Sequence, residues 1–146
     1  MKKLLFIFTL CLAFACKKKE NVNIDDITRY NWPLQSATVN PALTVNGKPS
    51  SNFMTLSGPD ACLSNNYALN FSPGGSYAFT STGSLCDMIS FQNAKWTKNG
   101  NEITLNTGFG NSETVNLNGN YITQKYTFDK EGKPYTVTYI FAAKSK

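Results

Sequence analysis

Short segments in which apolar and polar residues alternate, separated by turn sequences, occupy the chain from Tyr30 onward. No window there shows the 3.6-residue period of an amphipathic helix, whereas a period of two is typical of strands with one buried face. Three Asn-Gly pairs begin at Asn46, Asn99 and Asn118. Both residues tolerate the positive φ of a type I′ hairpin turn. The sequence therefore predicts an antiparallel all-β domain.

The turn sequences also predict which residues face each other. With two-residue loops at 99–100 and 118–119, apolar residues meet apolar residues across each hairpin. The connection at 129–134 gives the same agreement, and a slip of one residue would turn each strand over. The predicted pairs are Trp96 with Ile103, Val115 with Ile122, Phe128 with Tyr135, Tyr126 with Val137, Gln124 with Tyr139 and Ile122 with Phe141.

A further hairpin is predicted around the connection at 72–76. The register that puts both apolar sets on one face pairs Leu69 with Phe79, and its outward extension places Cys62 opposite Cys86. We therefore expect a disulfide between these two cysteines, which would stabilise the fold by about 3 to 4 kcal/mol in the chain-entropy model. Two separate buried thiols are the alternative.

The alternating segments number eight or nine and follow one another as consecutive hairpins. An antiparallel up-and-down meander of this length hides its edges most simply by closing into a barrel. An immunoglobulin-like sandwich is the alternative, but its Greek-key crossovers fit poorly with the short turns. The expected strands lie near residues 31–39, 52–57, 66–71, 76–81, 94–98, 101–106, 113–117, 120–128 and 134–143.

The amino-terminal segment is predicted to be an address and not part of the fold. Two lysines precede an apolar run over residues 4–16, which is too short to cross a bilayer as a helix. The sequence LAFAC at its end resembles the lipobox of bacterial lipoproteins. This resemblance implies a signal peptide over residues 1–15 and a mature amino terminus at Cys16 that carries lipid, including palmitate. Ordinary secretion after an A-x-A cleavage is the alternative.

Residues 16–29 are predicted to be a lipidated cysteine and a tether, because the segment is polar and lacks aromatic residues. Lys17 follows the cysteine, in place of the aspartate that marks inner-membrane retention in the best-known system. We therefore expect an outer-membrane protein of the cell envelope that contacts the membrane through its anchor. Residues 30–146 then form one barrel domain.

The absence of histidine excludes several chemistries. Ser-His and Cys-His nucleophile pairs, His-bearing zinc sites and histidine general bases all need an imidazole. The formal net charge is +5, but eight lysines and six acids from residue 30 onward leave +2, too little for a nucleic-acid-binding face. We expect no enzyme, no catalytic residues, no metal or other cofactor, and no nucleic-acid partner.

Five sequence blocks follow one another along the chain. They are NWPLQSATVN, a cysteine after GPDA, YALNFSPGGSYAF, AKWTKNGNEITL and YITQKYTF. Their order resembles the lipocalin-like domain common in small lipoproteins of Bacteroidota, over about residues 30–143. The resemblance implies a lipocalin-like barrel carried by a cell-envelope lipoprotein.

The predicted inward face is rich in aromatic residues, and five of its members are tyrosines. An eight-stranded barrel is just wide enough to fill with side chains or to hold one small ligand, so both interpretations stay open. Gln124 on this apolar face needs a hydrogen-bond partner, which a ligand, a water molecule or a tyrosine would supply. The predicted inward residues are Trp32, Leu34, Tyr67, Leu69, Phe71, Tyr77, Phe79, Trp96, Ile103, Val115, Ile122, Tyr126, Phe128, Tyr135, Val137, Tyr139 and Phe141.

The functional expectation is non-covalent binding of a small hydrophobic or amphipathic ligand in an aromatic-lined pocket. The alternative is a barrel with a filled core whose surface engages an envelope protein or a polysaccharide. The candidate pocket residues are Tyr67, Tyr77, Trp96, Gln124, Tyr126 and Tyr139.

Overall fold

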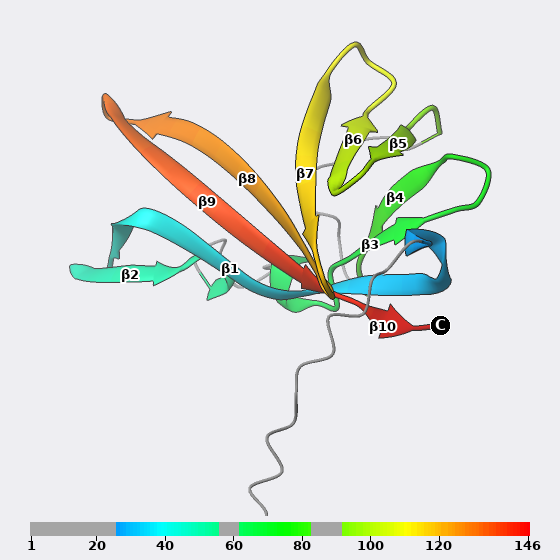
Figure 1. Ribbon diagram of the computed structural model, residues 1–146. Coiled ribbons are helices and arrows are strands. Elements are labelled where there is room, and N and C mark those ends of the chain that lie inside the picture. The colour runs from blue at the N-terminus through cyan, green and yellow to red at the C-terminus, as the bar shows by residue number, and fades with distance from the viewer. Residues whose placement is uncertain (1–25, 56–61, 83–91) are drawn as a thin grey trace, which may run out of the picture.

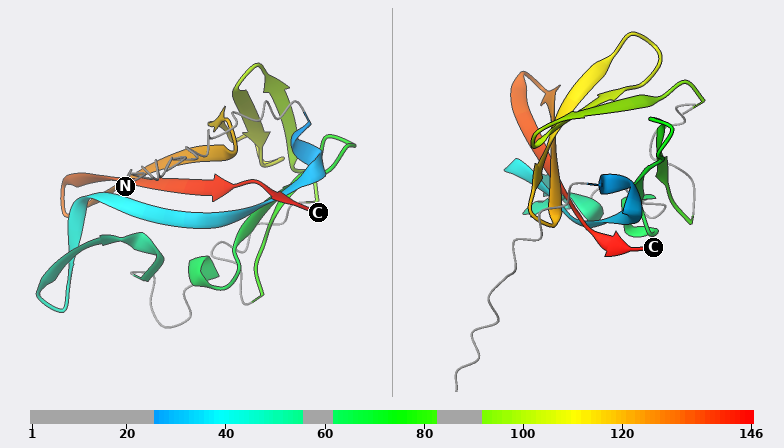
Figure 2. Two further views of the ribbon diagram at one scale, coloured as in Figure 1. Left: turned by 60° about the horizontal axis from the view of Figure 1, so that its bottom comes forward. Right: turned by 45° about the vertical axis from the view of Figure 1, so that its right-hand side comes forward.

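The computed structural model describes residues 26–55, 62–82 and 92–146, and most of them lie in β-strands (Figure 1). The strands form one antiparallel sheet that curls until it is nearly closed, which confirms the predicted all-β barrel. Figure 2 shows the strands arranged around a short 3₁₀ helix, η1 (Ile27–Arg29). The other elements are β1 (Tyr30–Val45), β2 (Lys48–Asn52), η2 (Phe53–Thr55), η3 (Cys62–Ser64), β3 (Ala68–Phe71), β4 (Tyr77–Thr80), β5 (Lys95–Asn99), β6 (Glu102–Asn106), β7 (Ser112–Asn118), β8 (Tyr121–Lys130), β9 (Lys133–Ala142) and β10 (Lys144–Ser145).

The long strand β1 joins the two halves of the sheet. On one edge it pairs with β9, which brings the beginning of the fold to its end, as closure of an up-and-down barrel requires. On the other edge its first part pairs with β3 and its second part with β2. The path through the sheet is β4-β3-β1-β9-β8-β7-β6-β5. The predicted consecutive order is therefore wrong at β2, because β3 pairs directly with β1 and β2 branches off this path.

The seam between β4 and β5 brings the two ends of this path together. Ser76 and Lys95 form a single antiparallel bridge there. The backbone N–H of Trp96 donates to the Gly75 carbonyl over 2.9 Å, and its indole Nε1 donates to the Ser72 carbonyl over 3.2 Å. The β3–β4 turn and the start of β5 therefore hold the barrel nearly closed.

Two of the predicted hairpin registers are confirmed. The β8–β9 hairpin turns at Glu131 and Gly132, both with positive φ, and the β3–β4 hairpin turns within 72–76. The loop at 46–47 also forms the predicted turn, and it connects β1 to β2. The confirmed pairs are Phe128 with Tyr135, Tyr126 with Val137, Gln124 with Tyr139, Ile122 with Phe141, Leu69 with Phe79 and Phe71 with Tyr77.

The registers predicted around 99–100 and 118–119 are wrong by two positions. The loops are instead 100–101 and 119–120, so that the glycine comes first and the following asparagine second. Of the two loop residues, the glycine alone has positive φ, as in a type II′ turn. A shift of two positions leaves every side chain on its predicted face. Trp96 thus pairs with Leu105 and not with Ile103, and Ile122 pairs with Leu117 and not with Val115.

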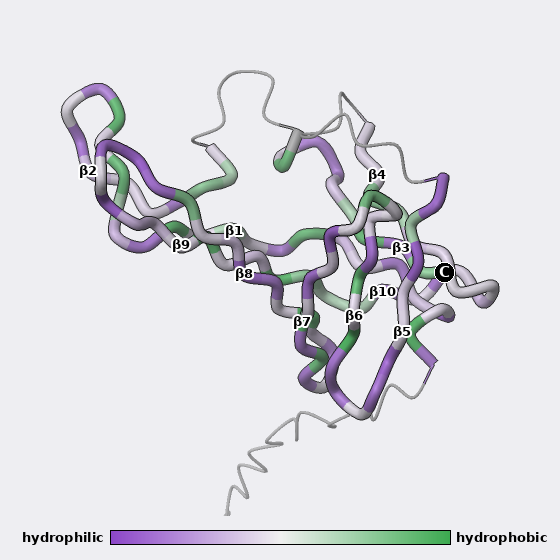
Figure 3. Tube along the Cα trace, turned by 90° about the horizontal axis from the view of Figure 1, so that it is seen from above, coloured by the Kyte–Doolittle hydropathy of each residue, from purple (hydrophilic) through white to green (hydrophobic). Residues whose placement is uncertain are grey.

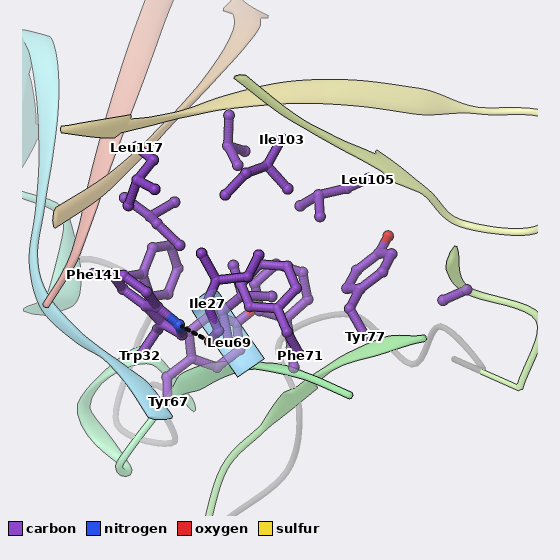
Figure 4. Packing of buried hydrophobic residues seen from close by; sticks show 14 of the residues in the cluster. Ile27, Trp32, Tyr67, Leu69, Phe71, Tyr77, Ile103, Leu105, Leu117 and Phe141 are labelled. Carbon is purple, nitrogen blue, oxygen red and sulfur yellow. Dashed lines mark hydrogen bonds between the residues drawn. The ribbon is translucent and has the colours of Figure 1, made fainter. Parts of the chain in front are cut away.

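The core fills the end of the barrel that η1 occupies (Figure 4). Trp32 is fully buried at its centre, and its indole Nε1 donates to the Ile27 carbonyl over 3.1 Å. Ile27 itself is buried, although it lies in the range predicted as tether. Apart from tyrosine and tryptophan, no buried side chain among the described residues is polar or charged. Buried residues outside the predicted inward set are Ile27, Ala37, Val39, Leu63, Ala94, Leu105 and Leu117.

Most of the predicted inward residues are buried, and the exceptions lie beside the core, at the β4–β5 seam and on β8 and β9. Leu34, Trp96 and Tyr139 are half-buried and pack against the core. Tyr126 lies on the predicted face, opposite the buried Val137, but it is 53% exposed and is not part of the core. The reason is that β8 has no partner among the described strands on one edge at Tyr126, whereas Val137 on β9 lies between β8 and β1. Together, β8, β9, β2 and the second half of β1 extend beyond the barrel as an arm (Figure 1).

The alternation that predicted the strands is visible along the chain. Hydrophobic and hydrophilic residues follow one another through β5, β6 and β7 in Figure 3.

The predicted disulfide between Cys62 and Cys86 stays a prediction, because Cys86 lies outside the described residues. Cys16 and the rest of residues 1–25 also lie outside them.

Candidate functional site

The arm separates from the barrel at a fork between β7 and β8. β7 pairs with β8 over three residue pairs, from Asn118 with Tyr121 to Asn116 with Thr123. Beyond Thr123, β8 continues with β9 as its partner among the described strands. Figure 1 shows β7 and β8 diverging from this point. The inner face of the arm, continuous with the barrel interior, forms the candidate site.

Aromatic side chains extend along this inner face from the core outward. The Tyr139 ring lies 6.5 Å from that of the buried Phe141, measured between ring centroids. Phe53 of η2 meets Tyr139 edge-on at 6.3 Å. We call the set that follows Phe141 the aromatic row, and its members are Phe53, Tyr126, Phe128, Tyr135 and Tyr139.

The outer part of the aromatic row lies on β8 and β9. The ring of Phe128 lies 6.4 Å from Phe53, 5.5 Å from Tyr135 and 5.9 Å from Tyr126, and the latter two contacts are stacked. Exposure does not follow position along the arm, since Tyr126 is 53% exposed whereas Phe128 and Tyr135, further from the barrel, are half-buried. The row therefore joins the core through Tyr139 and presents its most exposed ring at Tyr126.

A polar pair lies beside the row at the fork. Gln124 is the cross-strand neighbour of Tyr139, and its Nε2 donates to Oε1 of Glu113 over 2.6 Å. Glu113 alternates with the buried Val115 and Leu117 on β7, so its half-buried carboxylate faces inward. The expected partner of Gln124 was a ligand, a water molecule or a tyrosine. In the structure its amide instead donates to the carboxylate of Glu113. A ligand with an apolar body and a polar group would match this arrangement.

The six predicted pocket residues fall into three places. Gln124, Tyr126 and Tyr139 lie together on the arm. Tyr67 and Tyr77 are buried in the core, where Tyr67 stacks on Phe79 at 5.3 Å and Tyr77 meets the same ring edge-on at 6.1 Å. Trp96 lies at the β4–β5 seam, edge-on to Phe71 at 5.4 Å. The structure brings only the first group to the open face.

Two residues of the candidate site were missed at the sequence level for different reasons. Glu113 alternates with Val115 and Leu117 along β7, so the period-two pattern could have predicted that its side chain faces inward. Phe53 falls in a segment predicted as strand, whereas it begins the 3₁₀ helix η2. Its packing on Tyr139 and Phe128 depends on how β2 follows the arm, and no local pattern encodes that contact.

The described residues contain no group of three or more His, Cys, Asp or Glu side chains that could hold a metal ion. At η1, away from the aromatic row, hydrogen bonds from the hydroxyl (2.6 Å) and backbone N–H (2.9 Å) of Thr28 lower the pKa of Asp26. This contact caps a short helix and is structural.

In the described ranges, no helix has the length and apolar character needed to cross a membrane. No protein-family model, no curated protein and no solved structure matches the chain. The resemblance to lipocalin-like lipoproteins therefore stays a prediction.

Proposed function

We propose that this chain is a lipid-anchored protein of the cell envelope whose barrel binds a small hydrophobic or amphipathic ligand without covalent chemistry. The observation that carries the proposal is the aromatic row, which continues from the buried Phe141 to the exposed Tyr126. Aromatic rings supply large apolar contact area, and tyrosine hydroxyls add polar contacts at its rim. The ligand binds on the open face of the arm.

The distribution of buried side chains supports this location. Around η1, the interior is occupied by large residues such as Trp32 and Phe71, both almost completely buried. An eight-stranded barrel whose interior is filled by side chains has no room for a ligand at that end. The aromatic row and the Gln124–Glu113 pair lie where the sheet opens, so a ligand there would displace water from apolar surface without breaking the core.

The membrane anchor is supported by the amino-terminal sequence. The apolar run over residues 4–16, the small residues Ala13 and Ala15, and the cysteine that follows them fit a lipoprotein signal. Two or more acyl chains on Cys16 would give stable anchoring. Labelling with radioactive palmitate should mark the chain and should fail for Cys16→Ala. Equal labelling of both would leave a protein without an anchor at this residue.

Ligand binding is tested with an apolar dye on matched variants. N-Phenyl-1-naphthylamine should bind with enhanced fluorescence, and Tyr126→Ala should weaken binding about five- to tenfold, equivalent to about 1 kcal/mol. Tyr121→Ala is the control, because Tyr121 lies on the same strand, is 38% exposed and faces the opposite side by alternation. Equal loss in both variants would contradict the proposed site.

Native mass spectrometry of the protein from its own envelope gives an independent test. We expect a bound small molecule that is released from Tyr126→Ala and retained by Tyr121→Ala. Absence of any bound species, together with absence of dye uptake, would overturn the ligand-binding function.

The filled core also supports a second function. A barrel without an internal ligand would act through its outer surface and loops, as a module that engages an envelope protein or a polysaccharide. Crosslinking in intact cells would then recover the same partner repeatedly, and this recovery would be insensitive to Tyr126→Ala. Dye binding that follows the aromatic row favours the first function over this one.

A further inference from the structure

Along most of its length, one edge of β8 lacks a partner among the described strands. β8 pairs with β9 along all ten of its residues, but with β7 only over residues 121–123. Over residues 124–130, none of the described strands pairs with the edge that faces β7. Backbone N–H and C=O groups on such an edge can accept another strand.

The hairpin geometry shows which residues offer these groups. The pair that closes a two-residue loop is hydrogen bonded, and bonded and non-bonded pairs alternate along an antiparallel ladder. Asn118 and Tyr121 close the β7–β8 loop, so the odd-numbered residues of β8 direct their backbone groups toward β7. Lys130 and Lys133 close the β8–β9 loop, so the even-numbered residues bond to β9. Lys125, Thr127 and Asp129 therefore offer the backbone groups of the incomplete edge.

This edge is complementary to itself. If two copies of β8 pair antiparallel about a two-fold axis at Thr127, Lys125 of each copy faces Asp129 of the other. These residues are the ones with outward backbone groups, so each such pair is a hydrogen-bonded pair. All three side chains are exposed in the single chain. The register thus joins opposite charges at both ends of the new ladder, and cross-strand pairs of opposite charge stabilise sheets.

The opposite face of the same register is also complementary. Tyr126 of each copy faces Phe128 of the other, in the non-bonded positions where side chains approach most closely. Aromatic cross-strand pairs are among the stabilising combinations in antiparallel sheets. Lys130 of one copy then faces Gln124 of the other, next to the carboxylate of Glu113. Tyr126, more than half exposed in one chain, would meet Phe128 of the other copy on its strand-edge side, so the face of the arm that carries the aromatic row stays open.

From this self-complementary edge we infer that the protein forms a two-fold symmetric dimer, in which the β8 strands of two copies pair about Thr127. The arms then form one continuous sheet across both barrels. The surface is isologous, as a two-fold interface requires.

A cysteine at the two-fold axis gives the first test. In antiparallel hydrogen-bonded pairs the Cα atoms are about 5.5 Å apart, which is within the range for a disulfide. Thr127→Cys in the full chain, produced in its own envelope, should give a dimer on a non-reducing gel. Thr136→Cys is the matched control, because Thr136 lies on β9, one strand away from the proposed interface. Its hydroxyl oxygen is 3.2 Å from that of Thr127. Equal dimer for both, or none for Thr127→Cys, would overturn the inference.

Charge exchange gives the second test, with sedimentation of the full chain in mild detergent as the measurement. Lys125→Asp and Asp129→Lys each place like charges opposite each other, so each should raise the dimer Kd about tenfold or more. The double variant restores opposite charges and should restore dimerisation. A mixture of the two single variants should form heterodimers, since all charge pairs are then attractive.

The charge variants leave the aromatic row unchanged, which separates this inference from ligand binding. They should retain dye binding as monomers, because Tyr126 and Phe128 are unchanged in each chain and Tyr126 is exposed there. Failure of the double variant to dimerise, or a disulfide of Thr127→Cys to an unrelated protein, would contradict a symmetric β8 interface while leaving the ligand proposal standing.

Discussion

The side-chain amide of Gln124 donates a hydrogen bond to the Glu113 carboxylate over 2.6 Å, across the fork where β7 and β8 stop pairing. This contact joins the arm to the barrel at the point where the backbone ladder ends. Glu113→Ala should lower the free energy of unfolding by about 1 kcal/mol, because a half-buried amide loses a charged acceptor. Glu102→Ala, at an exposed position on β6, should change it by less than about 0.5 kcal/mol.

Urea unfolding of both variants measures this difference. A double-mutant cycle with Gln124→Ala should assign most of the effect to the pair. Equal stability of Glu113→Ala and Glu102→Ala would show that the hydrogen bond contributes nothing measurable to joining the two strands.

Gly108 and Gly110 provide a matched pair in the loop between β6 and β7. Both have a φ of +84°, but a Cβ on Gly108 would lie 2.7 Å from Asn93 Cβ and 2.9 Å from its carbonyl oxygen, whereas a Cβ on Gly110 meets nothing within 4 Å. Both alanine variants carry the cost of a left-handed backbone, about 1 to 2 kcal/mol. Gly108→Ala should be more destabilising than Gly110→Ala by thermal unfolding, since its contacts include backbone. Equal melting temperatures would contradict this.

The period-two pattern predicted the barrel because each strand buries one face. It placed Trp32, Leu69 and Phe141 correctly in the core. The two wrong registers have one physical cause, since each Asn-Gly pair is followed by a further asparagine, giving Asn-Gly-Asn. A loop that begins at either asparagine or glycine differs by two positions in pairing and keeps every side chain on the same face. The inward and outward pattern cannot distinguish the two.

The position of β2 and the candidate site were less accessible from the sequence. β1 pairs along both edges, with β9 on one and β3 then β2 on the other, and this depends on long-range pairing rather than local alternation. The pattern placed Tyr126 on the correct face, but alternation along β8 cannot show that β7 no longer pairs with this strand beyond Thr123, which leaves Tyr126 exposed. Gln124 and Tyr139 were predicted to be neighbours, whereas Phe53 joins them through η2.

Trp32 and Trp96 each donate an indole N–H to a backbone carbonyl, but in different surroundings. The Trp32 bond to Ile27 is buried, whereas the Trp96 bond to Ser72 is exposed to solvent. Trp32→Phe leaves a buried carbonyl without this donor, and we expect a loss of about 2 kcal/mol in urea unfolding. Trp96→Phe should cost less than about 1 kcal/mol, because water can replace the donor. A larger effect for Trp96→Phe would contradict this ordering.

The cap of η1 predicts how stability depends on pH. Hydrogen bonds from the hydroxyl and the backbone N–H of Thr28 lower the pKa of Asp26 below its usual value of about 3.9. The folded state therefore binds the proton less readily than the unfolded state, and the carboxylate stabilises the fold above about pH 3.9. As the pH falls through the lowered pKa, this contribution is lost.

The stability difference between the wild type and Asp26→Ala should be full at pH 6 and should shrink below about pH 3.9. In parallel, NMR titration of the Asp26 carboxyl should show its pKa rising in Thr28→Val, which removes the hydroxyl donor and keeps the shape. A pKa that is unchanged in Thr28→Val, or a stability difference independent of pH, would show that the Thr28 hydroxyl does not set the titration of this cap.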